Sequence, residues 1–141
     1  MPIVGFNFLK MSAEKNNSAA IQEKVNINND ISIKDVEESS LGKNKAIRMT
    51  YFFRSNYNPD LGKIELEGEV FFADKEKVMK EVMNSWEKNK KVPEDIMMDV
   101  LDFLLMKCNT QSIIISKDFN LPPPIPFPKV DRAKAGKEYI G

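Results

Sequence analysis

The chain has 141 residues, of which 42% are hydrophobic and 9% aromatic, which is enough to bury the core of a single domain. Its 21 basic and 21 acidic residues cancel, so no global positive field draws it to phosphate backbones, and nucleic acid is not expected as a principal partner. Histidine is absent, which excludes Ser/His and Cys/His catalysis.

Targeting and cofactor signals are also missing. The start, MPIVGFNFLK, has no basic segment ahead of an apolar run, and no apolar stretch approaches the ~20 residues that span a bilayer. Cys108 is the single cysteine, so no disulfide forms within the chain and a reducing compartment suits it. We expect a soluble cytoplasmic protein, and the lack of a Walker loop, a GxGxxG or a CxxC predicts no cofactor and no metal.

Two strands are predicted in the first third of the chain. Residues 6–14 alternate loosely between apolar and polar side chains, as a short strand does. Residues 25–39, VNINNDISIKDVEES, alternate again, and the polar NND at 28–30 is expected to interrupt this strand with a bulge or turn.

The next two segments have the clearest period of two and predict a β-hairpin. Residues 45–57 and 63–73 are joined by the turn-forming residues Asn58, Pro59, Asp60 and Gly62. The predicted inward residues are Ile47, Met49, Tyr51 and Phe53 in the first strand, and Ile64, Leu66, Val70 and Phe72 in the second. The predicted outward residues are Arg48, Thr50, Phe52 and Arg54, and then Lys63, Glu65, Glu67, Glu69 and Phe71.

Outward charges of opposite sign suggest contacts across this hairpin. Arg48 and Arg54 are expected to pair with the glutamates of the second strand, each pair contributing ~0.2 to 1 kcal/mol. Such pairs favour an antiparallel register without indicating a function.

After the strands the apolar period becomes helical. A helix over 74–91 is predicted, capped by Asp74, with its apolar face made of Val78, Met79, Val82, Met83 and Trp86. A second helix begins at Pro93 and directs inward Ile96, Met97, Val100, Leu101, Leu104, Leu105 and Cys108. It is expected to continue toward Ile115, although SIII at 112–115 also suits a strand. The predicted fold class is α+β, a four-stranded antiparallel sheet followed by two helices packed on one face.

A proline-rich arm, FNLPPPIPFPKV, follows the second helix. It places Leu121, Ile125 and Phe127 among five prolines, and its polyproline character would suit a reader of PxxP motifs. Because its apolar side chains are poorly suited to water, we favour an arm that packs on its own fold or on a partner subunit.

The order of these elements resembles the SecB family of export chaperones. The stretch from Pro93 to Val130 resembles the family's long helix and its proline-rich exit, and LEGEV at 66–70 resembles its acidic-apolar strand. The resemblance spans roughly residues 6–130 and implies one SecB-like domain at 1–128, with a polar C-terminal tail at 129–141. The chain lacks the cysteine- and histidine-containing zinc tail of the family's best-known members, so docking to an export ATPase is in doubt.

This resemblance implies an ATP-independent holdase, an oligomer such as a dimer or a dimer of dimers that binds unfolded or nascent polypeptides in apolar grooves. Eight methionines and nine phenylalanines suit the promiscuous binding that such a role requires. We expect the client-binding residues to be Phe52, Phe71, Trp86, Leu121, Ile125 and Phe127.

Two other surfaces are predicted from the same pattern. Adjacent Met97 and Met98 cannot both lie on one narrow helical stripe, so a second surface is expected as a subunit interface, made of Met97, Met98, Leu101 and Leu105. The acidic row Glu65, Glu67 and Glu69 is a solvated face or, alternatively, a partner-docking site.

Two alternatives to a holdase remain open. One is a non-catalytic dimeric adaptor that binds a single folded partner through the same arm. The other is an enzyme that relies on carboxylates, although no acid and base can be named as a pair. Breadth of binding separates the holdase from the adaptor.

Overall fold

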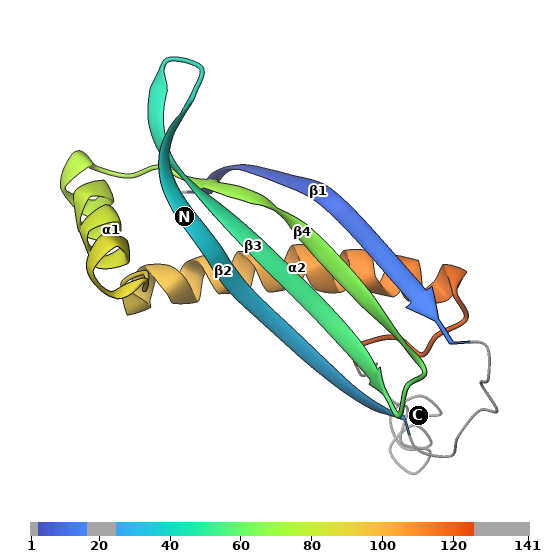
Figure 1. Ribbon diagram of the computed structural model, residues 1–141. Coiled ribbons are helices and arrows are strands. Elements are labelled where there is room, and N and C mark those ends of the chain that lie inside the picture. Colours follow the sequence, from blue (N-terminus) through green and yellow to red (C-terminus); the bar gives the residue numbers. More distant parts are fainter. Residues whose placement is uncertain (1–2, 17–24, 126–141) are drawn as a thin grey trace, which may run out of the picture.

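The computed structural model describes residues 3–16 and 25–125. Four strands pair in the order β1-β4-β3-β2, all antiparallel, and two helices follow them (Figure 1). This confirms the predicted α+β fold class. The elements are β1 (Ile3–Lys15), β2 (Asn26–Leu41), β3 (Asn44–Asn58), β4 (Gly62–Phe72), α1 (Glu76–Asn89) and α2 (Glu94–Asp118).

The core lies on one face of this sheet. The alternation predicted for β3 and β4 is confirmed, because every predicted inward residue of these two strands is at most 2% exposed. Both helices pack on the same face, since Val82 and Trp86 of α1 and Val100, Leu104 and Cys108 of α2 join the same apolar cluster. Each large side chain so buried contributes about 1.5–3 kcal/mol to folding.

The helices differ from expectation at their ends. Asp74 lies outside α1 and accepts a hydrogen bond from the Lys75 amide (2.6 Å), so the prediction that Asp74 caps this helix is wrong by one position. The suggestion that SIII forms a strand is also wrong, because α2 continues to Asp118. Its buried Ser112 donates to the Cys108 carbonyl oxygen (2.7 Å), which lets a polar side chain sit on the core face. Among the described residues, no helix is long and apolar enough to cross a membrane.

Strand β2 is continuous where an interruption was expected. The NND segment at 28–30 pairs in regular register with β3, Asp30 lying opposite Arg54. The irregularity falls instead between Ile33 and Asp35, at Lys34. Polar residues are tolerated at 28–30 because β2 is an edge strand, where side chains meet solvent.

A missing side chain at Gly68 lets three strands meet closely. The Tyr51 hydroxyl reaches past Gly68 in β4 and donates to the Asn7 carbonyl oxygen of β1 (3.2 Å). The Tyr51 ring stacks on Phe6 at 5.5 Å, and Phe6 meets Phe103 of α2 edge to face at 5.6 Å. A Cβ on Gly68 would lie 2.0 Å from the Asn7 oxygen and 2.5 Å from the Tyr51 hydroxyl.

We therefore expect Gly68→Ala to lower the free energy of unfolding by about 3 kcal/mol, since backbone must move to admit the methyl group. Gly42→Ala is the matched control, because Gly42 has φ +62° but nothing within 4 Å of the added Cβ. We expect its free energy of unfolding to fall by only about 1 kcal/mol, the cost of a side chain in the left-handed region. Urea denaturation measures both, and equal losses would contradict the close approach at Gly68.

Candidate functional site

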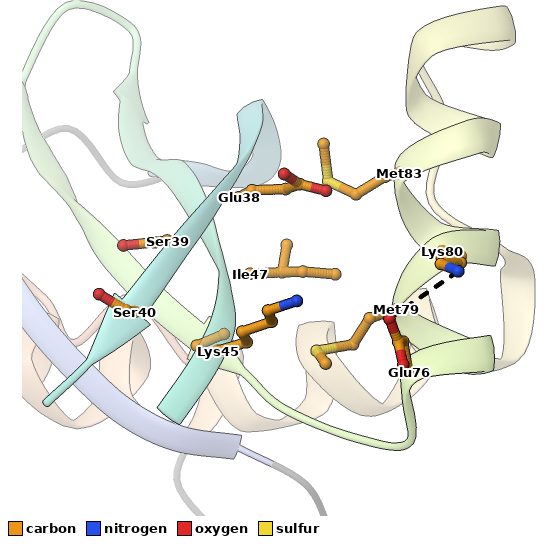
Figure 2. Close-up of a pocket in the computed structure, with 10 residues that line it drawn as sticks. Glu38, Ser39, Ser40, Lys45, Ile47, Glu76, Met79, Lys80 and Met83 are labelled. Carbon is orange, nitrogen blue, oxygen red and sulfur yellow. Dashed lines mark ion pairs between the residues drawn. The ribbon is translucent and has the colours of Figure 1, made fainter. Parts of the chain in front are cut away.

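A cleft opens where the β2–β3 hairpin extends beyond its neighbours. Strand β4 ends at Phe72, which pairs with Ile47, so the two longer strands continue as a ribbon to the turn at Gly42. This ribbon and α1 form opposite walls of an open cavity of about 420 Å³ (Figure 2). Its lining residues are Glu38, Ser39, Ser40, Lys45, Ala46 and Ile47 from the strands, and Glu76, Met79, Lys80 and Met83 from α1.

The middle of the cleft is apolar and its rim is charged. Ile47, Met79 and Met83 point toward one another across the gap, while Glu38 extends toward Met83 and Lys45 toward Met79 (Figure 2). The cleft therefore suits an apolar side chain whose flanking groups are polar or charged. Methionine is unbranched and flexible, so two of the apolar residues can adapt to occupants of different shape.

One ion pair lies on the helical wall. Lys80 Nζ is 3.8 Å from Glu76 Oε1, and both side chains are largely exposed, so the pair contributes little to stability. It is available to rearrange around an occupant.

Two of the predicted client-binding residues are used inside the fold. Trp86 is 8% exposed, and its ring lies under Lys90, whose Nζ is 5.6 Å from the ring centroid. Leu121 is 6% exposed, next to the half-buried Ile125. Phe127 lies outside the described residues.

Phe52 and Phe71 lie on the face of the sheet opposite the helices. Phe52 is half-buried, with Arg54 and Lys34 placed 5.1 Å and 5.7 Å from its ring centroid. Phe71 lies on this outward face as predicted, but it is only 7% exposed, so its ring is covered. The hairpin ribbon brings Leu41 against β1 at Gly5, where both Leu41 and Phe71 approach to within about 3 Å of an added Cβ, and this covers the ring.

The acidic row lies on this same polar face. Glu65 accepts from Arg54 Nη2 (2.9 Å) and is 3.4 Å from Lys63 Nζ, as the predicted cross-strand pairing requires. Glu69 accepts from the Asn7 side-chain amide (3.1 Å). Arg48 was also expected to pair with a β4 glutamate, and this is wrong: it pairs with Glu37 of β2, because its own β4 neighbour is Phe71.

The predicted interface residues of α2 do not share one exposed face, because Met97 and Leu105 pack against the core cluster. Met98 is 61% exposed, whereas Met97, Leu101 and Leu105 are half-buried beside it. The two adjacent methionines therefore do face different surroundings, as their spacing predicted. Whether they contact another subunit stays a prediction.

Two exposed apolar residues on β1 were not foreseen. Val4 and Leu9 are exposed, Leu9 by 65%, and each lies at a shift in the β1–β4 register. These two bulges break the alternation on which the sequence reading depended. The cleft was missed for a similar reason: Met79 and Met83 were taken as core residues, although the greater length of the two hairpin strands relative to 63–73 could have indicated an uncovered ribbon.

Reactive groups are few in the described part of the chain. Burial raises the pKa of the Cys108 thiol to about 12, which keeps it protonated and unreactive at neutral pH. No cluster of three metal-ligating side chains occurs among residues 3–16 and 25–125. The cleft and the edge strand β2 can bind another molecule without covalent chemistry, through apolar contact and backbone hydrogen bonds.

The Arg54 hydrogen bond to Glu65, helped by nearby Lys63, holds the pKa of this carboxyl below its ordinary value, against a smaller opposing effect of burial. The ionised form is thus favoured in the folded protein, and its stabilisation is present at neutral pH and lost as the pH falls through the lowered pKa. We expect Glu65→Gln to lower the free energy of unfolding by about 0.5 kcal/mol at pH 7 and by less at an acidic pH where the carboxyl is protonated. Urea unfolding at both pH values tests this, with Glu67→Gln, next on the same strand face, as the matched control, since it is Glu65 that accepts from Arg54.

Comparisons with known proteins bear on the fold. No protein-family model matches the sequence, and no curated protein is significantly similar to it. Two chains of solved structures match the structure. One is the Mycobacterium tuberculosis Rv1957 SecB-like chaperone in complex with a ChAD peptide from the Rv1956 HigA1 antitoxin, with a TM-score of 0.56 and 12% identity over 92% of this chain and 88% of that chain. At this identity the likeness establishes the fold alone, and the chain has a SecB-like fold.

Proposed function

We propose that the protein is an ATP-independent holdase that binds unfolded or nascent polypeptides and performs no chemical reaction on them. The observation that carries this proposal is the cleft between α1 and the hairpin ribbon, which combines apolar and charged groups beside an edge strand. The SecB-like fold supports it, and so does the complex of the Rv1957 chaperone with a peptide.

The geometry of β2 suits an extended client segment. Beyond the irregularity at Lys34, the run Val36–Leu41 pairs regularly with β3 on one side and borders the cleft on the other. An edge strand offers backbone N–H and C=O groups to any extended chain, whatever its sequence. Successive client side chains would alternate, and those that point toward α1 would meet Met79 and Met83.

Self-association forms part of the proposal. The exposed Met98, with Leu101 and Leu105 beside it, forms an apolar strip on the helix side, and Val4 and Leu9 are exposed on the β1 edge. Exposed apolar surface of this kind is typical of subunit interfaces. We assign Met97, Met98, Leu101 and Leu105 to a contact between copies of the chain.

An adaptor for one partner is the second candidate. It is favoured by the peptide from a single antitoxin in the complex of the Rv1957 chaperone. The two functions differ in breadth, since a holdase binds many unrelated unfolded chains and an adaptor binds one.

The cleft is tested by changing Met79 and Met83 together to Ser and measuring, by light scattering without ATP, the suppression of aggregation of several unrelated denatured clients. We expect the protein concentration needed for half-suppression to rise about tenfold, because losing ~1.4 kcal/mol of apolar contact is a factor of ten in affinity. Met106→Ser is the matched control: Met106 is 58% exposed but lies on α2, outside the cleft.

If wild-type protein suppresses none of these clients, the holdase proposal fails and the adaptor becomes the leading function. If the double variant and the Met106→Ser control behave alike, clients bind elsewhere on the molecule.

The interface is tested by Met98→Glu, which places a charge in the apolar strip of α2. We expect the mass measured by light scattering after gel filtration to fall toward that of one 16.1 kDa chain, because burying an unpaired carboxylate is costly. Ile114→Glu is the control, since Ile114 is also half-exposed on α2 but lies about 160° around the helix from Met98. An unchanged mass in Met98→Glu would remove this surface from the interface.

A further inference from the structure

The chain after α2 lies across one end of the sheet. We name residues 120–125, NLPPPI, the strap. The helix ends when Asn120 takes a left-handed conformation (φ 53°) and the Leu121 amide donates to the Ser116 carbonyl oxygen (2.9 Å). This turn sends the strap back over the helix-facing side of the sheet, where Leu121 is buried.

Three strap carbonyls, two residues apart from one another, accept hydrogen bonds from side chains of three strands. The Asn120 oxygen accepts from Lys15 Nζ of β1 (3.4 Å), and the Pro122 oxygen from the Tyr57 hydroxyl of β3 (2.7 Å). The Pro124 oxygen accepts from Asn29 Nδ2 of β2 (2.9 Å). The three accepting carbonyls therefore belong to alternate residues of the strap.

The prolines in the middle of the strap can form hydrogen bonds only through their carbonyl oxygens. Its three consecutive prolines have no N–H group, so they can only accept hydrogen bonds. The donors therefore contact the main chain, which every polypeptide possesses, and not a side chain peculiar to proline. The strap buries two apolar side chains, Leu121 and Pro124.

The donors are positioned from within the sheet. Asn29 Oδ1 accepts from the hydroxyl of Ser55 (2.6 Å), a residue that is 0% exposed, so the Asn29 amide is aimed by a contact that does not involve the strap. Tyr57 is 1% exposed and its ring is fixed in the core cluster. Such donors would keep their places if the strap left.

We propose that Lys15, Asn29 and Tyr57 form a second polypeptide-binding site, which reads alternate main-chain carbonyls of a client segment while apolar side chains of that segment are buried, and which the strap occupies as a built-in competitor. This inference deepens the proposed function and rests on it, because the segment that displaces the strap is part of an unfolded client. The site lies at the end of β2 and β3 opposite the cleft, so a client bound at both would lie along the sheet (Figure 1).

The test adds a fluorescein-labelled peptide FNLPPPI, the sequence of residues 119–125, to the full chain and follows its anisotropy. In wild-type protein the strap competes and binding is weak. Leu121→Ser removes the buried apolar anchor of the strap, and we expect the peptide to bind at least about tenfold more tightly, since apparent affinity scales with the fraction of sites that are open. Phe119→Ser, at a more exposed position just before the strap, is the control and leaves the affinity unchanged.

A second change asks whether the named donors bind the peptide. Tyr57→Phe in the Leu121→Ser chain removes one hydroxyl and keeps the ring, and we expect it to reverse most of the gain. Release of the strap is measured separately. Burial raises the pKa of Tyr57 to about 12, and an exposed Tyr57 would ionise at lower pH, as absorbance near 295 nm reports.

The proposal is overturned if the strap stays docked in Leu121→Ser, or if it leaves and the peptide binds no better, or if Tyr57→Phe has no effect on the gain. Should Leu121→Ser fail to fold, Leu121→Val allows the same comparison with a smaller perturbation. Failure here is distinct from failure of the holdase proposal, because aggregation suppression by wild-type protein is measured without reference to the strap.

Discussion

The contact between Tyr51 and Asn7 across Gly68 is the constraint on which the rest of the structure depends. It joins β3 to β1 through the strand between them, and the Tyr51 ring continues the contact to Phe6 and then to Phe103 of α2. Gly68 therefore sets the distance between β1 and Tyr51. Through the Tyr51 and Phe6 rings it also sets the position of α2 on the sheet. The position of α2 in turn determines where the chain emerges after Asp118 and reaches the strands again.

From this arrangement the two ends of the sheet acquire different characters. At one end β2 and β3 outrun β4, so the ribbon has no third strand beside it and faces α1 across an open gap. At the other end the three prolines after Leu121 cross the strands and cover Tyr57. The helix-facing side thus has one open end and one covered end. On the other face, Leu41 and Phe71 both lie close to Gly5 of β1.

Much of the fold could be predicted from the sequence, because the period of two in residues 45–57 and 63–73 and the helical period after 74 are local signals. The buried faces of β3 and β4 follow directly from them. Phe71 was misjudged because its cover, Leu41, is distant in sequence and reaches it only through the curl of the hairpin. Arg48 was misassigned because either neighbouring strand can supply a partner, and only the register, which sets Phe71 opposite it in β4, decides between them.

The candidate site was less predictable for the same reason. Met79 and Met83 fit the apolar face of α1, and whether that face meets a strand or an opening depends on the relative lengths of three strands. The donors Lys15, Asn29 and Tyr57 lie far apart in the chain, and nothing in the local pattern around each indicates that they meet one segment. Leu121, which the sequence predicts to line a groove, is itself buried at this end of the sheet.

The irregular register of the two outer strands affects how copies of the chain can pair with one another. A long flat edge strand would let copies of the chain add to one another without limit, a hazard for any protein that exposes apolar residues. In β1 the shifts at Val4 and Leu9, and in β2 the shift at Lys34, divide each edge into short runs. A short extended segment can match one run, whereas a second sheet cannot match a whole edge. The irregularities that interrupt the alternation in the sequence thus allow a short foreign strand to pair with an edge and prevent the growth of fibres.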